Sequence, residues 1–337
     1  MTRGVSLHVG INEVSSDAFS AAPLVSCMND AVTMSNIALA RGFTEVKLLL
    51  GPEATFQRVV AEIERAAVGV GRLVAGDIFL FTFAGHGSRV PDSERLLSEE
   101  PDRKDEAIVL YDRLLLDDYL QRVLWPKFDK GVRIVGVADS CHSGSALFAM
   151  MDTDEFSGSI TDHLAFSALG EAGSITAFTS VHMTEMHSLI SANMATETLP
   201  PTVAEEPLPE EEPVVAIGGN RLRELSVGQG RAHRVANKSF YDNLKIPSLK
   251  DASPIQASLI TMGACQDDAT TMDGDSDGNG FFTRALLEVW NNGAFAGDYV
   301  TFRDEIEQKI AVSSPGQQPV LKPEVLPAFS SQSPFSI

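Results

Sequence analysis

A cysteine and a histidine each stand directly after a short apolar run, where their side chains could do chemistry. Cys141 follows Val132–Ala138 and lies among small polar residues in Asp139-Ser-Cys-His-Ser-Gly144. His86 stands between two glycines just after Ile78–Ala84. An imidazole beside a thiol lowers its pKa or accepts its proton, and the resulting thiolate is a strong nucleophile. The two residues therefore indicate covalent catalysis by a cysteine.

Both apolar runs are typical of buried strands, because they are short, rich in β-branched and aromatic residues, and bounded by turn-forming residues. A cysteine inside such a strand is usually an inert packing group, but Cys141 lies beyond the apolar part. The carboxyl ends of strands in an α/β sheet are where ligands bind. Glycines on both sides of His86 allow a sharp turn and a close backbone approach. The backbone N–H groups of Gly87 and Cys141 are candidates for an oxyanion hole.

Apolar patterning along the chain predicts strands that alternate with helices, which favours a mainly parallel α/β sheet. From about residue 150 the periodicity weakens, and 199–213 combines prolines with a run of glutamates that disfavours packing. We therefore predict a first region over 1–150, a flexible linker over 151–236, and a second region over 237–337 that completes the sheet. The expected strands are 5–11, 46–50, 77–84, 107–111, 132–138 and 257–264, and the expected helices are 30–41, 55–68, 117–124, 281–291 and 299–311.

Composition excludes several function classes. The 337 residues carry a formal net charge of −20, which argues against nucleic acid as a partner. Three scattered cysteines make neither a disulfide framework nor a zinc motif, and they favour a reducing compartment. The sequence has no recognisable signal peptide and no apolar stretch of the length that a membrane span needs. We expect a cytoplasmic protein that binds no membrane.

The order of the two motifs, Ala84-Gly-His-Gly-Ser88 and then Asp139-Ser-Cys-His-Ser-Gly144, resembles the metacaspases and their bacterial relatives, the orthocaspases. The resemblance covers most of 5–150 and 237–325 but not the linker. It implies a caspase-like fold with a large and a small subunit region, and a cysteine endopeptidase with a Cys141–His86 dyad. Further matching segments are Ser26-Cys-Met-Asn-Asp-Ala31, Lys104-Asp-Glu, Asn237-Lys-Ser-Phe-Tyr241, Gly263-Ala-Cys-Gln-Asp-Asp268 and Asn279-Gly-Phe-Phe-Thr-Arg-Ala285.

Substrate preference follows from the same resemblance. Asp30 and Asp139 match the aspartates that line the S1 pocket of metacaspases, and Cys27 matches a further pocket position. Two converging carboxylates would bind a guanidinium, so the implied substrates are proteins and peptides with arginine, or less well lysine, at P1. On its own, Asp30 could equally cap a helix. Ala84 departs from the family pattern, which commonly has serine there.

Calcium is an open question in the sequence. Asp105, Asp117 and Asp118 match carboxylates that bind an activating Ca²⁺ in some metacaspases, but a fourth expected ligand falls near Phe148, which cannot coordinate. The resemblance thus requires no cofactor and leaves Ca²⁺ optional. The segment 273–278 imitates the start of an EF-hand loop, but position 12 lacks the bidentate glutamate, so we interpret it as a turn.

The linker offers candidate processing sites. Family resemblance suggests a zymogen that is activated by cleavage between the two regions, by itself or by an upstream protease. The alternative is an ordinary solvated loop whose arginines offset its glutamates. Two other functions compete with the endopeptidase: a catalytically silent caspase-like scaffold or regulator, and a Ca²⁺-binding signalling module. The candidate P1 residues for processing are Arg221, Arg223, Arg231 and Arg234.

Overall fold

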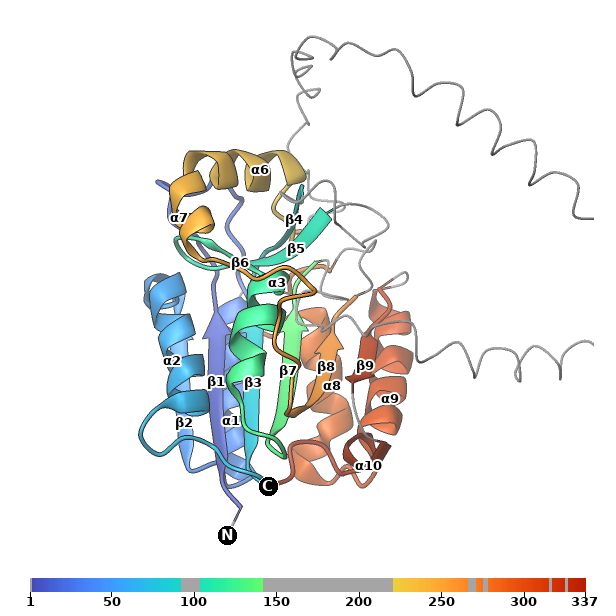
Figure 1. Ribbon diagram of the computed structural model, residues 1–337. Coiled ribbons are helices and arrows are strands. Elements are labelled where there is room, and N and C mark those ends of the chain that lie inside the picture. The colour runs from blue at the N-terminus through green and yellow to red at the C-terminus, as the bar shows by residue number, and fades with distance from the viewer. Residues whose placement is uncertain are drawn as a thin grey trace, which may run out of the picture. The chain divides into compact units, whose positions relative to one another are not determined.

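The computed structural model describes residues 2–91, 104–141, 221–265, 271–274, 278–314, 317–324 and 327–337. Within these residues, one sheet has the strand order β2-β1-β3-β7-β8-β9 (Figure 1). All neighbouring strands run parallel except β8 and β9, which are antiparallel. The predicted mainly parallel α/β sheet is therefore confirmed. The strands are β1 (Gly4–Gly10), β2 (Glu45–Leu50), β3 (Ile78–Ala84), β7 (Arg133–Asp139), β8 (Ser258–Gly263) and β9 (Val320–Glu324).

Helices cover both faces of this sheet and bury two apolar cores. Helix α2 (Phe56–Val68) packs on one face through Val59 and Ile63, since its apolar residues recur at helical spacing. Helices α1 (Cys27–Ala40), α8 (Phe281–Trp290) and α9 (Tyr299–Ser313) contribute to the core on the other face. The central strands β1, β3 and β7 are buried on both sides, as parallel strands between helices are. Two short helices, α3 (Asp117–Tyr119) and α10 (Pro327–Ser330), also lie near the sheet.

A small antiparallel sheet lies beyond the carboxyl ends of the main strands (Figure 1). It consists of β4 (Gly87–Pro91), β5 (Lys104–Val109) and β6 (Leu114–Leu116). The sequence predicts a strand near β5 but not its partners.

Two helices lie beside this small sheet: α6 (Val227–Ala236) and α7 (Lys238–Asn243). Ordered structure over 221–236 differs from the flexible linker that the sequence predicts up to residue 236. The rest of the predicted linker lies outside the described residues. None of the helices that the structure describes has the length and apolarity to cross a membrane.

A buried histidine in β1 is expected to make the fold sensitive to acid. His8 is fully buried, and Nδ1 lies 2.9 Å from the Thr82 hydroxyl oxygen. Burial lowers the pKa of His8 from 6.5 to about 3. Below pH 6.5 the unfolded chain therefore binds a proton that the native chain does not, so stability falls as the pH drops. We expect protonation of His8 in the unfolded chain to lower the free energy of unfolding by about 2 kcal/mol between pH 7 and pH 5.

Urea unfolding of wild type and His8→Gln at both pH values measures this effect. The variant should lose less stability on acidification by about that amount. Equal losses in the two proteins would contradict the assignment to His8.

Candidate active site

The register of the central strands places the two catalytic candidates side by side at one edge of the sheet. β3 and β7 pair in parallel, with Ala84 opposite Asp139. His86 and Cys141 each follow two residues later, so both lie just past the carboxyl ends of neighbouring strands. Both are buried in this structure. The position predicted for these residues from the apolar runs agrees with the observed strands.

Hydrogen bonding orients the His86 ring. Its Nε2 lies 2.9 Å from the carbonyl oxygen of Ala22. Because a carbonyl only accepts, Nε2 must carry the hydrogen, which leaves Nδ1 as the basic nitrogen. Nδ1 has no hydrogen-bond partner among the described residues. Burial lowers the pKa of His86, while contacts with the backbones of Ala22 and Glu224 oppose that shift. The ring is thus a neutral base beside Glu224.

Two backbone amides converge on one carbonyl oxygen of the same chain. The N–H groups of Gly87 and Cys141 donate to the carbonyl oxygen of Arg223, at 2.9 and 3.2 Å. These are the two donors that the sequence suggests for an oxyanion hole. A Cβ on residue 87 would lie 1.9 Å from the Cys141 carbonyl oxygen, so only glycine fits there.

The side chain of Arg223 fills a fully buried acidic pocket. Its Nη2 donates to Asp30 Oδ2 at 2.5 Å and to Asp273 Oδ1 at 3.2 Å. Its Nη1 lies 2.8 Å from Asp139 Oδ1 and also donates to the Asp139 carbonyl oxygen. We call the site formed by Asp30, Asp139 and Asp273 the arginine pocket. One guanidinium therefore contacts three carboxylates.

Residues around α8 hold two of these carboxylates in place. Asp30 Oδ1 accepts hydrogen bonds from Asn279 Nδ2 and from the Gly280 amide, both at 2.9 Å. Asp139 Oδ2 accepts from the Thr283 hydroxyl and amide, at 2.7 and 3.2 Å. A Cβ on Gly280 would lie 2.3 Å from Arg223 Nη2, so a side chain there would obstruct the pocket. Asp30 thus lies in the first turn of α1 and points into the pocket rather than capping that helix.

Asp273 is a pocket residue that the sequence interpretation missed. The acidic, glycine-rich segment 273–278 has the composition of a solvated turn. The structure buries the Asp273 carboxylate, which accepts hydrogen bonds from the Val25 and Ser26 amides at 2.6 and 3.3 Å and from the Ser26 hydroxyl. These bonds tie residue 273 to the start of α1, beside Asp30. No local pattern in the sequence indicates such a long-range contact.

The backbone around Arg223 is bound like an added strand. The Arg223 amide donates to the Thr271 carbonyl oxygen at 2.9 Å, and the Asp273 amide donates to the Arg221 carbonyl oxygen at 2.8 Å. Leu222 and Met272 face each other in an antiparallel bridge between these bonds. On the other side, the Leu225 amide donates to the Gly87 carbonyl oxygen at 2.8 Å. Residues 221–225 therefore cross the site in an extended conformation, as strand-binding sites hold peptides.

The charges of the site depend on this occupied state. Burial alone would lower the pKa of Arg223, but its carboxylate neighbours, Asp139 foremost, raise that pKa well above the usual value. Burial raises the pKa of Asp139 to about 6, although Arg223 opposes the shift. Burial also raises the pKa of Cys141, and the Thr271 amide donates to its sulfur at 2.9 Å. In the occupied site Cys141 is a thiol, and its S–H donates to the Thr271 carbonyl oxygen at 3.4 Å.

The sequence of this chain is similar to those of known proteins. The profile of the caspase domain matches residues 3–335 of the chain. The chain belongs to the caspase-domain family. Metacaspase-9 of Arabidopsis thaliana is 34% identical over 131 residues, which is 37% of this chain and 39% of that protein. Metacaspase-1 of Cryptococcus neoformans is 30% identical over 152 residues, 42% of this chain and 32% of that protein.

The chain thus spans less than half of the length of these two relatives. A solved structure of a Geobacter sulfurreducens protein is 28% identical and covers 99% of both chains, with a TM-score of 0.67. The caspase-like fold expected from the two motifs is confirmed by the family match and by the sheet.

The other site residues predicted for this caspase domain lie outside the arginine pocket or at the edge of that pocket. Cys27 is buried at the start of α1, and Arg223 lies close enough to influence its pKa, which burial raises. Of the processing candidates, only Arg223 enters the pocket. Arg221 is exposed two residues earlier, while Arg231 and Arg234 lie within α6, where regular helix disfavours cleavage.

Of the three calcium candidates, the side chains of Asp117 and Asp118 belong to the described part of this caspase domain. Within that part, no group of three His, Cys, Asp or Glu side chains could hold a metal ion. Asp118 is ion-paired with Arg122 at 2.8 Å, and Asp117 accepts a hydrogen bond from Gln121 at 3.4 Å. The side chain of Asp105 lies outside the described residues. Calcium activation stays a prediction of the resemblance, and assays with and without EGTA test it.

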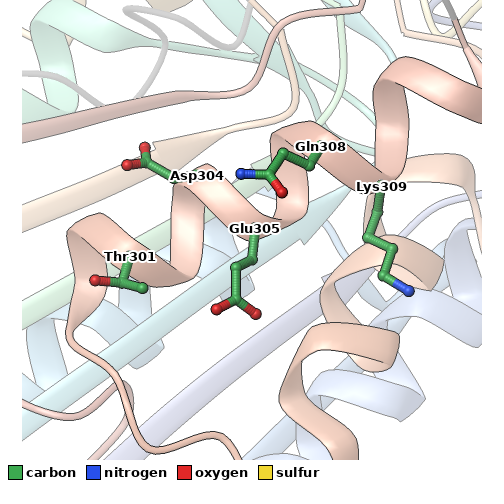
Figure 2. Close-up of a pocket in the computed structure, with 5 residues that line it drawn as sticks. All are labelled: Thr301, Asp304, Glu305, Gln308 and Lys309. Atoms are coloured by element: carbon green, nitrogen blue, oxygen red, sulfur yellow. The ribbon is translucent and has the colours of Figure 1, made fainter.

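A separate hollow lies along one face of α9 (Figure 2). It contains neither of the catalytic candidates of this caspase domain, and the side chains around it are those of a mostly exposed helix face. Lys309 already pairs with Glu288 at 3.2 Å. We assign no function to this hollow. Its lining residues are Thr301, Asp304, Glu305, Gln308 and Lys309.

Proposed function

We propose that this protein is a cysteine endopeptidase that cleaves after arginine and is made as a self-occupied zymogen. The position of Arg223 carries this proposal. Its side chain fills the arginine pocket while its carbonyl oxygen accepts from the amides of Gly87 and Cys141. A peptide bound in this way presents the Arg223–Glu224 bond for cleavage. We therefore narrow the four processing candidates to Arg223.

The chemistry follows from the groups around that bond. His86 Nδ1 takes the proton of the Cys141 thiol, and the sulfur attacks the Arg223 carbonyl carbon. The developing oxyanion is stabilised by the amides of Gly87 and Cys141. His86 then gives its proton to the Glu224 nitrogen as the peptide bond breaks, which leaves a thioester on Cys141. Water, deprotonated by His86, hydrolyses the thioester and restores the thiol.

Specificity for arginine over lysine follows from geometry. The two terminal nitrogens of Arg223 contact different carboxylates, Asp139 through Nη1 and Asp30 with Asp273 through Nη2. A planar guanidinium can make both sets of contacts at once, whereas an ammonium is a single point charge. Substrates of this protein would accordingly be proteins or peptides with arginine at P1, and an acidic P1 residue would be repelled.

Self-occupation supports regulation by cleavage. While residues 221–223 fill the site, an external substrate has no access to the arginine pocket. Cleavage after Arg223, by the protein itself or by an upstream protease, releases that segment from its covalent connection to Glu224. The three free cysteines of the chain suit a reducing setting such as the cytoplasm, where we place this activity.

The test combines mass spectrometry with a peptide panel. Purified wild type should be cut between residues 223 and 224 and should release a fluorophore from peptides with arginine at P1. Release should be weaker with lysine and absent with aspartate. Cys141→Ala should stay intact and inactive, which excludes a contaminating protease. An intact wild-type chain with no activity on any peptide would instead favour a silent caspase-like scaffold.

A further inference from the structure

The segment that follows the proposed scissile bond is anchored independently of that bond. The Leu225 amide donates to the Gly87 carbonyl oxygen at 2.8 Å, and the Leu225 side chain is buried in the core. Ser226 caps α6 by accepting from the Gln229 amide. None of these contacts involves Arg223, so cleavage removes none of them.

Helix α6 fixes this anchor on the small sheet. Gly230 packs so closely on β4 that an added Cβ would lie 2.6 Å from the Ser88 hydroxyl oxygen. Further along, His233 stacks on Phe19 with ring centroids 4.3 Å apart, and its Nδ1 lies 3.0 Å from the Ala18 carbonyl oxygen. A cut after residue 223 would thus leave the new amino terminus of Glu224 tethered beside the site by one residue and a packed helix.

The position of that amino terminus suits attack on an acylated Cys141. Gly87 joins the two reaction partners, because its amide binds the acyl carbonyl oxygen of Arg223 while its carbonyl oxygen holds Leu225. The Glu224 backbone lies close enough to His86 to raise the pKa of its ring. Well-oriented groups in one molecule react with effective concentrations of roughly 10⁵–10⁸ M. The Glu224 amine should therefore compete strongly with water for the thioester.

We propose that the cleaved protein is also a peptide ligase that transfers acyl groups from Cys141 to its own Glu224 amine. This rests on the proposed function, because the thioester is the peptidase intermediate. The amine nitrogen forms a bond to the acyl carbon, the carbon–sulfur bond breaks, and a proton passes from the attacking nitrogen through His86 to the sulfur. The products are a new peptide bond at residue 224 and a free thiol. Any peptide acyl group that ends in arginine is a donor.

The experiment uses the self-cleaved full-length protein and the donor acetyl-Arg-Leu-Arg-aminomethylcoumarin, at pH 8, near the pKa of an α-amine. Fluorescence reports acylation, and acid-quenched mass spectrometry reports the fragment that begins at Glu224. We expect fluorophore release together with a fragment heavier by the acetyl-Arg-Leu-Arg acyl group. Fluorophore release with an unmodified fragment would overturn the ligase and leave the peptidase intact. No release at all would contradict the proposed peptidase activity on external substrates.

Two variants test the anchor. Leu225→Ala should reduce the ratio of ligated fragment to released fluorophore several-fold, because the amine loses its buried tether. Val235→Ala changes an exposed residue at the far end of α6 and should leave that ratio unchanged. If Leu225→Ala does not fold, the wild-type mass measurement still decides the proposal. An equal ratio in Leu225→Ala and wild type would show that the tether is not what delivers the amine.

Discussion

Replacing Arg223 by alanine is expected to leave the chain uncut after residue 223 and to open the arginine pocket of the intact protein. The substitution removes the group that pairs with Asp30, Asp139 and Asp273, and with it the contacts that hold the segment in the site. Self-cleavage at this bond should fall at least about 1,000-fold, since several charge-assisted contacts are lost together. The intact variant should nevertheless hydrolyse peptides with arginine at P1.

Arg221→Ala is the matched control, because it makes the same change at an exposed side chain two residues earlier. It should cleave after Arg223 like the wild type. Fragment masses over time, together with peptidase assays on the uncut protein, measure both effects. Continued cutting between residues 223 and 224 in Arg223→Ala would contradict the proposed role of this side chain.

The same variant should be less stable, because three buried carboxylates lose their counter-charge. Breaking a buried pair by removing one partner costs about 3–5 kcal/mol. Benzamidine, whose planar amidinium cation resembles the end of the arginine side chain, should restore part of this loss by binding the empty pocket, with about 2.7 kcal/mol recovered at 100 times its Kd. Thermal melts with benzamidine measure the rescue. An equal shift of Tm in wild type and variant would show that the compound binds elsewhere.

Neutralising the pocket carboxylates is expected to cause the largest loss of specificity. Asp30→Asn and Asp139→Asn keep the shape of the pocket but remove a charge that contacts the guanidinium. Truncating one partner of a buried charge pair costs about 2–5 kcal/mol, so kcat/KM for arginine peptides should fall roughly 30- to 5,000-fold. Of the three substitutions, Asp273→Asn should lower kcat/KM least, because the distance from Asp273 Oδ1 to Arg223 Nη2 is the longest, at 3.2 Å.

A citrulline peptide separates charge recognition from damage to the fold, since citrulline has the shape of arginine without its charge. The pocket variants should lose activity on arginine but not on citrulline, so their preference for arginine collapses. Asp304→Asn, on α9, is the control for the change in net charge and should retain the preference. A kcat/KM for arginine within threefold of wild type in Asp30→Asn and Asp139→Asn would contradict the assigned pocket.

The positions of the catalytic candidates could be predicted from the sequence because they depend on local patterns. Apolar runs end at Ala84 and near Asp139, and the parallel register of β3 and β7 then brings the following residues together. The identity of the pocket acids Asp30 and Asp139 came from family resemblance. Asp273 could not be found in this way, because its burial depends on bonds to Val25 and Ser26, nearly 250 positions away in the chain.

Helix α6 was missed for a different physical reason. Its sequence contains Gly228 and Gly230, which lower helix propensity, and its apolar residues show little periodicity. The packing that Gly230 permits against β4 stabilises the helix, so tertiary contact overrides local preference. The partners of β5 in the small sheet were missed because β4 starts directly at the Gly-His-Gly turn, where glycines indicate a loop rather than a strand.

The pairing of β7 with β8 has a thermodynamic consequence for a cut chain. These neighbouring strands come from either side of residue 223, so cleavage there produces two polypeptides that share one sheet and one core. Unfolding of the intact chain is a unimolecular process, whereas unfolding of the cut protein also separates two molecules. The melting temperature of the cut form therefore depends on protein concentration, and dilution favours its dissociation. A low cellular concentration would in this way limit the lifetime of the cleaved protein.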